Sequence, residues 1–129
     1  MRLLLDTHAL IWVLTASRTL PPSLRHLIED ERNDVYFSSI SILEIASKRA
    51  ARSRSAPAIS SDRVAELARQ SGFLEIGITS AHAAAVETIA RFHPDPFDRL
   101  LLGQAQIQGL QLVTHDEDLA QYDSRIILF

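Results

Sequence analysis

Short apolar runs separated by amphipathic segments dominate the chain. The first run is residues 3–5, three consecutive leucines. A continuous apolar run of this length favours a strand that is covered on both faces, as in a parallel sheet. Further strands are predicted at residues 34–37, 73–78, 110–113 and 125–129.

The segments between these strands have the pattern of amphipathic helices. Pro21 and Pro22 suit a first helical turn, and Gly72 and Gly109 suit the positions just after helix ends. Helices are predicted at residues 7–14, from 22 past 28, 40–51, 61–70, 79 to about 91, 97–108 and, briefly, after residue 116. This order predicts an α/β fold, with helices on both faces of a central, mostly parallel sheet of four or five strands.

Composition adds limits to this picture. The 129 residues fit one domain, with 47% hydrophobic and 22% charged residues, the balance of a soluble globular protein. The absence of cysteine excludes disulfides and thiolate metal sites and favours a reducing cytoplasm. No secretory signal is visible, and no apolar run approaches the roughly 20 residues that span a bilayer, so no membrane association is expected. A net charge of −3 argues against a surface that coats nucleic acid, although it is compatible with an enzyme acting on one.

Acidic residues stand close to the ends of the predicted strands. Asp6 directly follows the first strand and Asp116 closely follows the fourth, while Asp98 and Glu44 lie on predicted helices. In open parallel sheets, ligands bind outside the carboxyl ends of the strands. Because helices that follow parallel strands begin at that same edge, the four carboxylates are expected to converge on one cleft.

Structural roles are the alternative for three of these acids. Asp6 and Asp116 are each suited to cap the helix that follows them. Asp95 would cap the helix that contains Asp98, and Asp98, in its first turn, would interact favourably with the helix dipole. Glu44 is poorly explained by capping because it lies between apolar residues. An inward-facing, unpaired charge would be costly, so Glu44 either has a partner or lies on a solvated face.

Convergence of these acids would require a cation. Two carboxylates about 5 Å apart repel by roughly 3 kcal/mol at an effective dielectric constant of about 20. Oxygen-only sites favour Mg²⁺, with Mn²⁺ as a possible substitute. The pattern therefore predicts a divalent cation held by carboxylates.

Four segments also carry a family pattern. They are Leu-Leu-Asp-Thr-His-Ala-Leu-Ile-Trp (4–12), Ser-Ser-Ile-Ser-Ile-Leu-Glu-Ile-Ala (38–46), Asp-Pro-Phe-Asp-Arg-Leu-Leu (95–101) and Leu-Val-Thr-His-Asp-Glu-Asp-Leu (112–119). Together, and in this order, they resemble PIN-domain ribonucleases, and more narrowly the VapC toxins of type II toxin–antitoxin systems. Gly103 departs from the pattern, because similar toxins often carry a larger residue there.

The resemblance implies a single PIN domain over residues 1–129 and Mg²⁺-dependent endonuclease cleavage of RNA. It implies metal-binding and catalytic acids at Asp6, Glu44, Asp98 and Asp116, with Thr7 as an auxiliary hydroxyl and Asp118 as a further acid. It also implies a homodimer and a cognate VapB-like antitoxin whose tail enters the cleft, with DNA contacted only through the antitoxin. Apolar residues of the first helix, Ile11, Trp12 and Leu14, are candidates for these partner surfaces.

Other charged residues have more than one interpretation. The basic stretch Lys48, Arg49, Arg52 and Arg54 either contacts RNA phosphates or is a solvated helix end. Arg99 either pairs with a site carboxylate, meets a phosphate or is a surface charge. His8, His93 and His115 lie near the acids and are compatible with a transition-metal site or acid–base chemistry, but their spacing matches no common ligand pattern.

Two other functions compete with the nuclease. One is a non-catalytic partner module that acts through the toxin–antitoxin complex in transcriptional autoregulation. The other is a phosphatase with a nucleophilic aspartate, which usually needs a second acid two residues on, whereas Asp6 is followed by Thr7 and His8.

Overall fold

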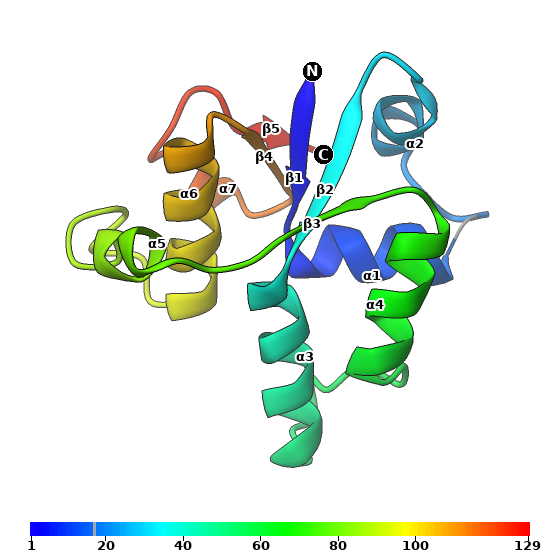
Figure 1. Cartoon of the computed structure of the whole chain (residues 1–129), viewed down its shortest axis with the longest axis horizontal. Coiled ribbons are helices and arrows are strands. Elements are labelled where there is room, and N and C mark those ends of the chain that lie inside the picture. Colours follow the sequence, from blue (N-terminus) through cyan, green and yellow to red (C-terminus); the bar gives the residue numbers. More distant parts are fainter. Residues whose placement is uncertain (17) are drawn as a thin grey trace.

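A parallel sheet of five strands forms the centre of the computed structural model, which describes residues 1–16 and 18–129 (Figure 1). The strand order is β3-β2-β1-β4-β5, and every neighbouring pair is parallel. The strands are β1 (Arg2–Leu5), β2 (Asp34–Ser38), β3 (Leu74–Ile76), β4 (Gln111–Thr114) and β5 (Ile127–Leu128). The predicted α/β fold with a parallel central sheet is confirmed.

Helices cover both faces of the sheet. They are α1 (Thr7–Thr15), α2 (Pro22–Glu29), α3 (Ser39–Ala50), α4 (Ser61–Gln70), α5 (Ser80–Ala85), α6 (Pro96–Gln108) and α7 (Glu117–Ala120). Buried residues of α1, α2 and α4 form one core cluster with the sheet, and those of α6 and α7 form a second. Helix α3 contributes to both clusters, and its far end extends away from the sheet (Figure 1).

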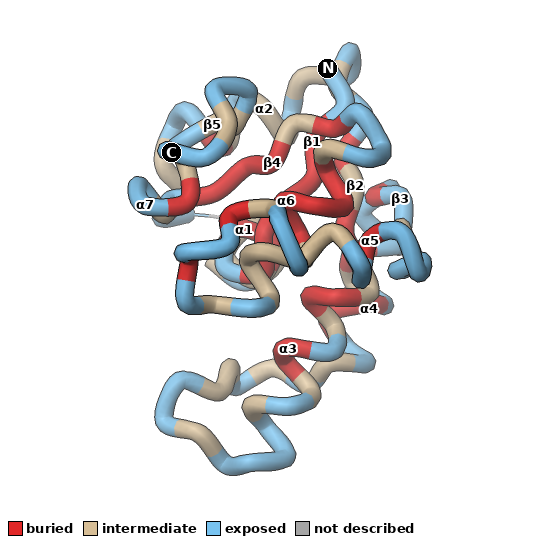
Figure 2. Tube along the Cα trace, turned by 90° about the vertical axis from the view of Figure 1, so that its left-hand side faces the viewer, coloured by how far each residue is buried: buried red, intermediate tan, exposed pale blue. Residues whose placement is uncertain are grey.

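Strand β1 lies at the middle of the molecule. Its three leucines are fully buried, with Leu3 and Leu5 in one core cluster and Leu4 in the other. Burial on both faces explains why the strand is continuously apolar. Figure 2 shows this buried centre, in contrast to the exposed loop that follows α3. The neighbours of β1 are β2 and β4, so the residues that follow these strands emerge at one edge of the sheet.

The helix predicted from residue 79 to about 91 is wrong in its length, because α5 ends at Ala85. Residues 86–92 form turns, and Ala90 has a φ of 48°. The side chain of Arg99 donates to the carbonyl oxygens of Val86 and Ile89, which gives these groups partners outside a helix. Similarly, the strand predicted at 73–78 is paired only over Leu74–Ile76.

Gly103 lies where α5 and α6 approach each other closely. A Cβ atom at this position would come within 3.2 Å of the Cβ of Ala85. Close packing of α5 against α6 therefore explains why residue 103 is a glycine. Among the described residues, none of the helices has the length and hydropathy that a membrane span requires.

Candidate active site

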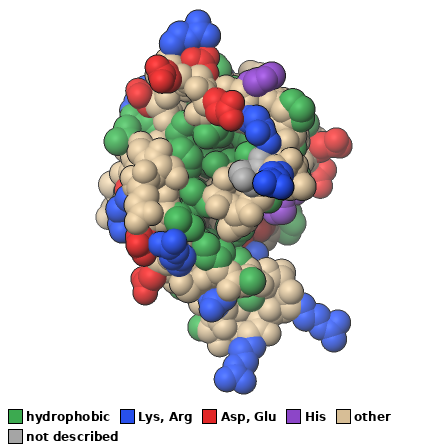
Figure 3. All heavy atoms as spheres, turned by 90° about the vertical axis from the view of Figure 1, so that its right-hand side faces the viewer, with side chains coloured by type: hydrophobic (Ala, Val, Ile, Leu, Met, Phe, Trp, Pro, Cys, Tyr) green, Lys and Arg blue, Asp and Glu red, His purple; other side chains and the backbone are tan. Residues whose placement is uncertain are grey.

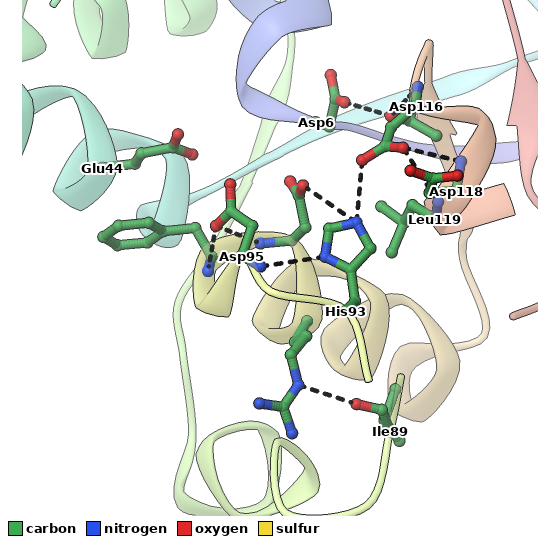
Figure 4. A network of polar contacts seen from close by, with 12 residues as sticks. Asp6, Glu44, Ile89, His93, Asp95, Asp116, Asp118 and Leu119 are labelled. Carbon is green, nitrogen blue, oxygen red and sulfur yellow. Dashed lines mark hydrogen bonds and ion pairs between the residues drawn. The ribbon is translucent and has the colours of Figure 1, made fainter. Parts of the chain in front are cut away.

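Four carboxylates come from four elements that meet at the carboxyl edge of the sheet. Asp6 follows β1 and Asp116 follows β4, and these strands are parallel neighbours in the sheet. Glu44 lies on α3 and Asp98 in the first turn of α6. Figure 4 shows Asp6 and Asp116 close together, with Glu44 reaching toward them from α3. The structure thus brings together the acids that sequence position predicted to converge.

Asp6 is buried and uses both carboxylate oxygens. Its Oδ1 accepts from the backbone N–H of Ala9 at 2.7 Å, which caps α1. Its Oδ2 accepts from the hydroxyl of Thr114 at 2.5 Å. Burial raises the pKa of Asp6 above its ordinary value, although the hydrogen bonds from Thr114 and Ala9 oppose that rise. The predicted capping role is therefore real, and it coexists with a position at the edge of the cleft.

Asp116 divides its oxygens in a similar way. Oδ1 caps α7 by accepting from the backbone N–H groups of Asp118 and Leu119, at 2.9 and 3.2 Å. Oδ2 lies 3.0 Å from Nε2 of His93. Burial would raise the pKa of Asp116, but the hydrogen bonds from Leu119 and His93 outweigh it, so the pKa lies below its ordinary value. Thr114 connects the two aspartates, because its Oγ1 also accepts from the backbone N–H of Asp116 at 3.1 Å.

Asp98 lies near the other acids, and its carboxylate makes no hydrogen bond within residues 1–16 and 18–129. Asp95 caps α6, as predicted, by accepting from the N–H groups of Phe97 and Asp98. Burial and the charges of Asp95, Asp6 and Glu44 raise the pKa of Asp98 to about 7. The ring of His93 lies nearby, with Nε2 at 3.9 Å from Oδ2 of Asp98. A carboxylate in this position is half ionised near neutral pH unless a cation joins the site.

Glu44 is buried, which excludes the solvated face considered above. Its Oε2 pairs with the ammonium group of Lys48 at 2.7 Å, one helical turn away. Its Oε1 is buried and has no hydrogen-bond partner among the described residues. A pocket of about 100 Å³ adjoins Glu44, and its lining includes Thr7 and His8 from α1. A buried carboxylate oxygen without a partner is costly, which indicates a ligand at this position.

These observations fit a divalent cation. Carboxylate oxygens of Asp98 and Asp116 lie within 4.8 Å of each other, and a ring nitrogen of His93 lies within the same distance of both. Oε1 of Glu44 has no hydrogen-bond partner among the described residues, and the pKa of Asp98 is raised by burial and then by the charges of Asp95, Asp6 and Glu44. Hard oxygen donors of this kind favour Mg²⁺ or Mn²⁺.

The remaining predicted residues lie at different distances from this centre. The hydroxyl of Thr7 donates to Oγ of Ser41 at 3.0 Å, which connects α1 to α3 beside Glu44. Asp118 is exposed, next to Asp116 (Figure 4). Arg99 instead donates to backbone carbonyls of the segment after α5.

Arg49 and Arg52 lie at the far end of α3. Arg49 donates to the carbonyl of Pro57 at 2.7 Å, and Arg52 is exposed in the turn that follows the helix. The structure therefore separates these two arginines from the acids and places them on the projecting end of the molecule.

Two features of the site were not expected from the sequence. Thr114 had no assigned role, although a polar residue at the end of an apolar strand was a visible signal. The imidazole rings of His8 and His115 stack with centroids 4.2 Å apart, and each ring lies one or two residues from a site aspartate. Burial and the charge of His115 lower the pKa of His8. Nothing in the spacing of these histidines indicated that they would meet.

Comparisons with known proteins agree with this geometry. The PIN domain family matches residues 3–124. The fold is similar to VapBC2 from Rickettsia felis bound to a DNA fragment from their promoter, with a TM-score of 0.66 and 16% identity, covering 100% of this chain and 98% of that chain. It is also similar to a toxin–antitoxin complex from Klebsiella pneumoniae (TM-score 0.65, 17% identity, 96% and 94% covered). FitAcB from Neisseria gonorrhoeae is a third similar structure (TM-score 0.53, 19% identity, 98% and 96% covered).

At these identities the likeness to solved structures shows a shared fold. A comparison with curated protein sequences gave no match.

Proposed function

Because this chain belongs to the PIN domain family, we propose that it is a metal-dependent endoribonuclease and acts as a VapC-type toxin. The observation that carries the proposal is the group of four carboxylates at one sheet edge, where one buried oxygen of Glu44 has no hydrogen-bond partner in the described part of the chain. Such a site suits a phosphodiester, whose hydrolysis needs both a cation and an oriented water molecule. RNA as the substrate follows from the family resemblance.

Asp6, Asp98 and Asp116 are the proposed ligands of Mg²⁺, which Mn²⁺ can replace. A bound cation would offset negative charge on the phosphoryl oxygen and make a nearby water molecule more acidic. Asp6 and Asp116 are held in place by their helix caps and by Thr114, so their orientation is set before substrate arrives. A bound cation would favour the ionised form of Asp98, whose pKa is raised to about 7 by burial and by the charges of Asp95, Asp6 and Glu44.

Glu44 is the proposed group that orients the attacking water. Lys48 holds Oε2 of Glu44, and this hydrogen bond raises the pKa of Lys48, so the ammonium stays charged. Oε1 remains available as an acceptor for the water. In-line attack by that water would release a 5′-phosphate and a 3′-hydroxyl.

The projecting end of α3 is the proposed RNA-binding surface. Figure 3 shows Lys and Arg side chains extending from this end of the molecule. Arg49, Arg52 and Arg54 are exposed there. Contacts from these side chains to phosphates would position RNA without reading its sequence.

An antitoxin is the proposed protein partner, and a homodimer is the proposed assembly. A groove of about 350 Å³ is lined by His8, Ile11 and Trp12 of α1 and by Pro57, and it shares His8, Ile11 and Pro57 with the pocket at Glu44. An antitoxin tail lying in this groove would reach the acidic site and block it. Trp12→Ala is expected to weaken the complex in a pull-down, and unchanged assembly would contradict this placement.

RNA cleavage tests the nuclease directly. The wild type is expected to cleave structured RNA with Mg²⁺ and to stop when EDTA is added, while Asp6→Asn and Asp98→Asn should lose cleavage. Asp34→Asn is a matched control, because this exposed aspartate begins β2 at the opposite end of the strand. Equal cleavage by the wild type and both site variants would remove the proposed active site.

A partner module without catalysis is the second candidate. It is favoured by one finding, that a similar fold occurs in a VapBC2 complex bound to a DNA fragment from their promoter. Expression in a host cell separates the two functions. Growth arrest that persists with Asp6→Asn would favour binding over chemistry.

A further inference from the structure

His93 occupies a buried position between two of the proposed metal ligands. It belongs to the loop before α6, and its side chain is 5% exposed. Nε2 lies 3.0 Å from Oδ2 of Asp116 and 3.9 Å from Oδ2 of Asp98. By distance alone, the ring is placed either to bind a cation together with these aspartates or to hydrogen-bond to them.

The other ring nitrogen distinguishes these two roles. The backbone N–H of Asp95 donates to Nδ1 of His93 at 3.2 Å (Figure 4). A backbone amide can only donate, so Nδ1 must present a lone pair and carry no proton. The proton of the neutral ring therefore lies on Nε2, where it points at Asp116.

A protonated Nε2 has no lone pair for a cation. Binding a metal through this atom would require the proton to move to Nδ1, where it would face the N–H of Asp95 and break that hydrogen bond. We propose that His93 is a positioning residue of the nuclease site, whose Nε2–H holds the Asp116 carboxylate while the ring stays outside the metal coordination shell. This inference rests on the proposed metal site.

Both carboxylate oxygens of Asp116 are held by hydrogen bonds. Oδ1 is held by the N–H groups of α7 and Oδ2 by His93, so the carboxylate cannot rotate. Oδ1 accepts two hydrogen bonds, so the lone pair that remains available to a cation is the second one of Oδ2. Because Asp95 also caps α6, the same short loop fixes His93, and through it Asp116, relative to Asp98. Partners that orient metal ligands in this way typically change metal affinity by about 10- to 100-fold when they are removed.

The ring tautomer is the first test and needs no activity. Long-range ¹H–¹⁵N NMR on the metal-free protein is expected to show the Nε2–H tautomer for His93, assigned by loss of its signals in His93→Gln. The Nδ1–H tautomer would overturn the proposal. After Mn²⁺ is added, electron spin-echo spectroscopy should show no ¹⁴N coupling from His93. A ¹⁴N coupling in the wild type that disappears in His93→Gln would identify the ring as a ligand and also overturn it.

Metal affinity is the second test. His93→Leu, which removes the donor, is expected to weaken Mn²⁺ binding by about 10- to 100-fold. His93→Gln, which keeps an N–H donor at a similar reach, should restore most of that affinity. His26→Leu is the matched control, because His26 is exposed on α2. Equal losses in the Leu and Gln variants, or no loss in either, would overturn the positioning role.

These measurements also separate this proposal from the proposed function. If the wild type binds no Mn²⁺, the metal site itself is overturned. The tautomer measured without metal still decides whether the Nε2–H of His93 faces Asp116.

Discussion

Asp98→Asn should stabilise the metal-free protein while abolishing its proposed activity. In the folded chain, burial and the charges of Asp95, Asp6 and Glu44 raise the pKa of Asp98 from 3.8 to about 7. The unfolded chain loses this proton near pH 4, whereas the folded chain keeps it to about pH 7. Between these values the folded state binds more protons, so the free energy of unfolding falls as the pH rises.

The structure gives a magnitude for this effect. A rise in pKa from 3.8 to about 7 corresponds to about 4 kcal/mol, since each tenfold change in proton affinity is about 1.4 kcal/mol. The side chain is 20% exposed, so solvent screening reduces the effect to about 2–4 kcal/mol. Asparagine has nearly the same shape as aspartate and never ionises. The gain from Asp98→Asn should therefore be about 2–4 kcal/mol at pH 8 and smaller by about 2 kcal/mol at pH 5.

Urea unfolding in EDTA at pH 5 and pH 8 measures this gain. Asp34→Asn, at an exposed position, should change the free energy of unfolding by less than about 0.5 kcal/mol at both pH values. Mg²⁺ at about 1,000 times its Kd should reverse the order at pH 8, because it stabilises the wild type by about 4.1 kcal/mol and the variant lacks a ligand. A gain from Asp98→Asn that is absent, or equal at both pH values, would refute the electrostatic account of the site.

Three further changes test other parts of the structure. Thr114→Val should lower the free energy of unfolding by about 1–3 kcal/mol, because a buried oxygen of Asp6 loses its hydrogen-bond donor. Thr114→Ser keeps the hydroxyl and should recover most of this loss. Equal free energies for the two variants in urea unfolding would contradict this role. Gly103→Val should lower the free energy of unfolding by about 1–3 kcal/mol, since a Cβ at this position would lie 3.2 Å from the Cβ of Ala85. An unchanged midpoint in thermal unfolding would show that α5 and α6 can move apart without cost. Arg52→Asn removes a positive charge at a φ of 51°, a backbone conformation that asparagine tolerates. RNA affinity should fall, and the slope of the logarithm of the RNA association constant against the logarithm of the salt concentration should shrink by about 1. An unchanged slope would exclude a phosphate contact.

The fold followed closely from local sequence signals. The three leucines of β1 predicted a strand buried on both faces, and the structure shows them fully buried in two core clusters. Proline at the start of α6 and glycine after its end marked that helix accurately. The end of α5 was not predictable in the same way, because the alanine-rich sequence has no stop signal there, and the carbonyls of Val86 and Ile89 instead accept from Arg99 on the next helix.

The acidic site was predictable as a set of positions, but its contacts were not. Strand ends and helix starts placed Asp6 and Asp116 at one edge, and both also proved to be helix caps. The role of His93 depends on a loop of two prolines whose path the sequence does not specify. Its ring meets Asp116 only because that loop returns to the end of β4.

The position of a bound cation tests the central claim most directly. A crystal soaked in Mn²⁺ should show an anomalous peak within coordination distance of carboxylate oxygens from Asp6, Asp98 and Asp116, with the ring of His93 still hydrogen-bonded to Asp116. A fully soaked crystal with no peak among these carboxylates, or with its only peaks elsewhere on the surface, would contradict the claim that the four acids form a metal site.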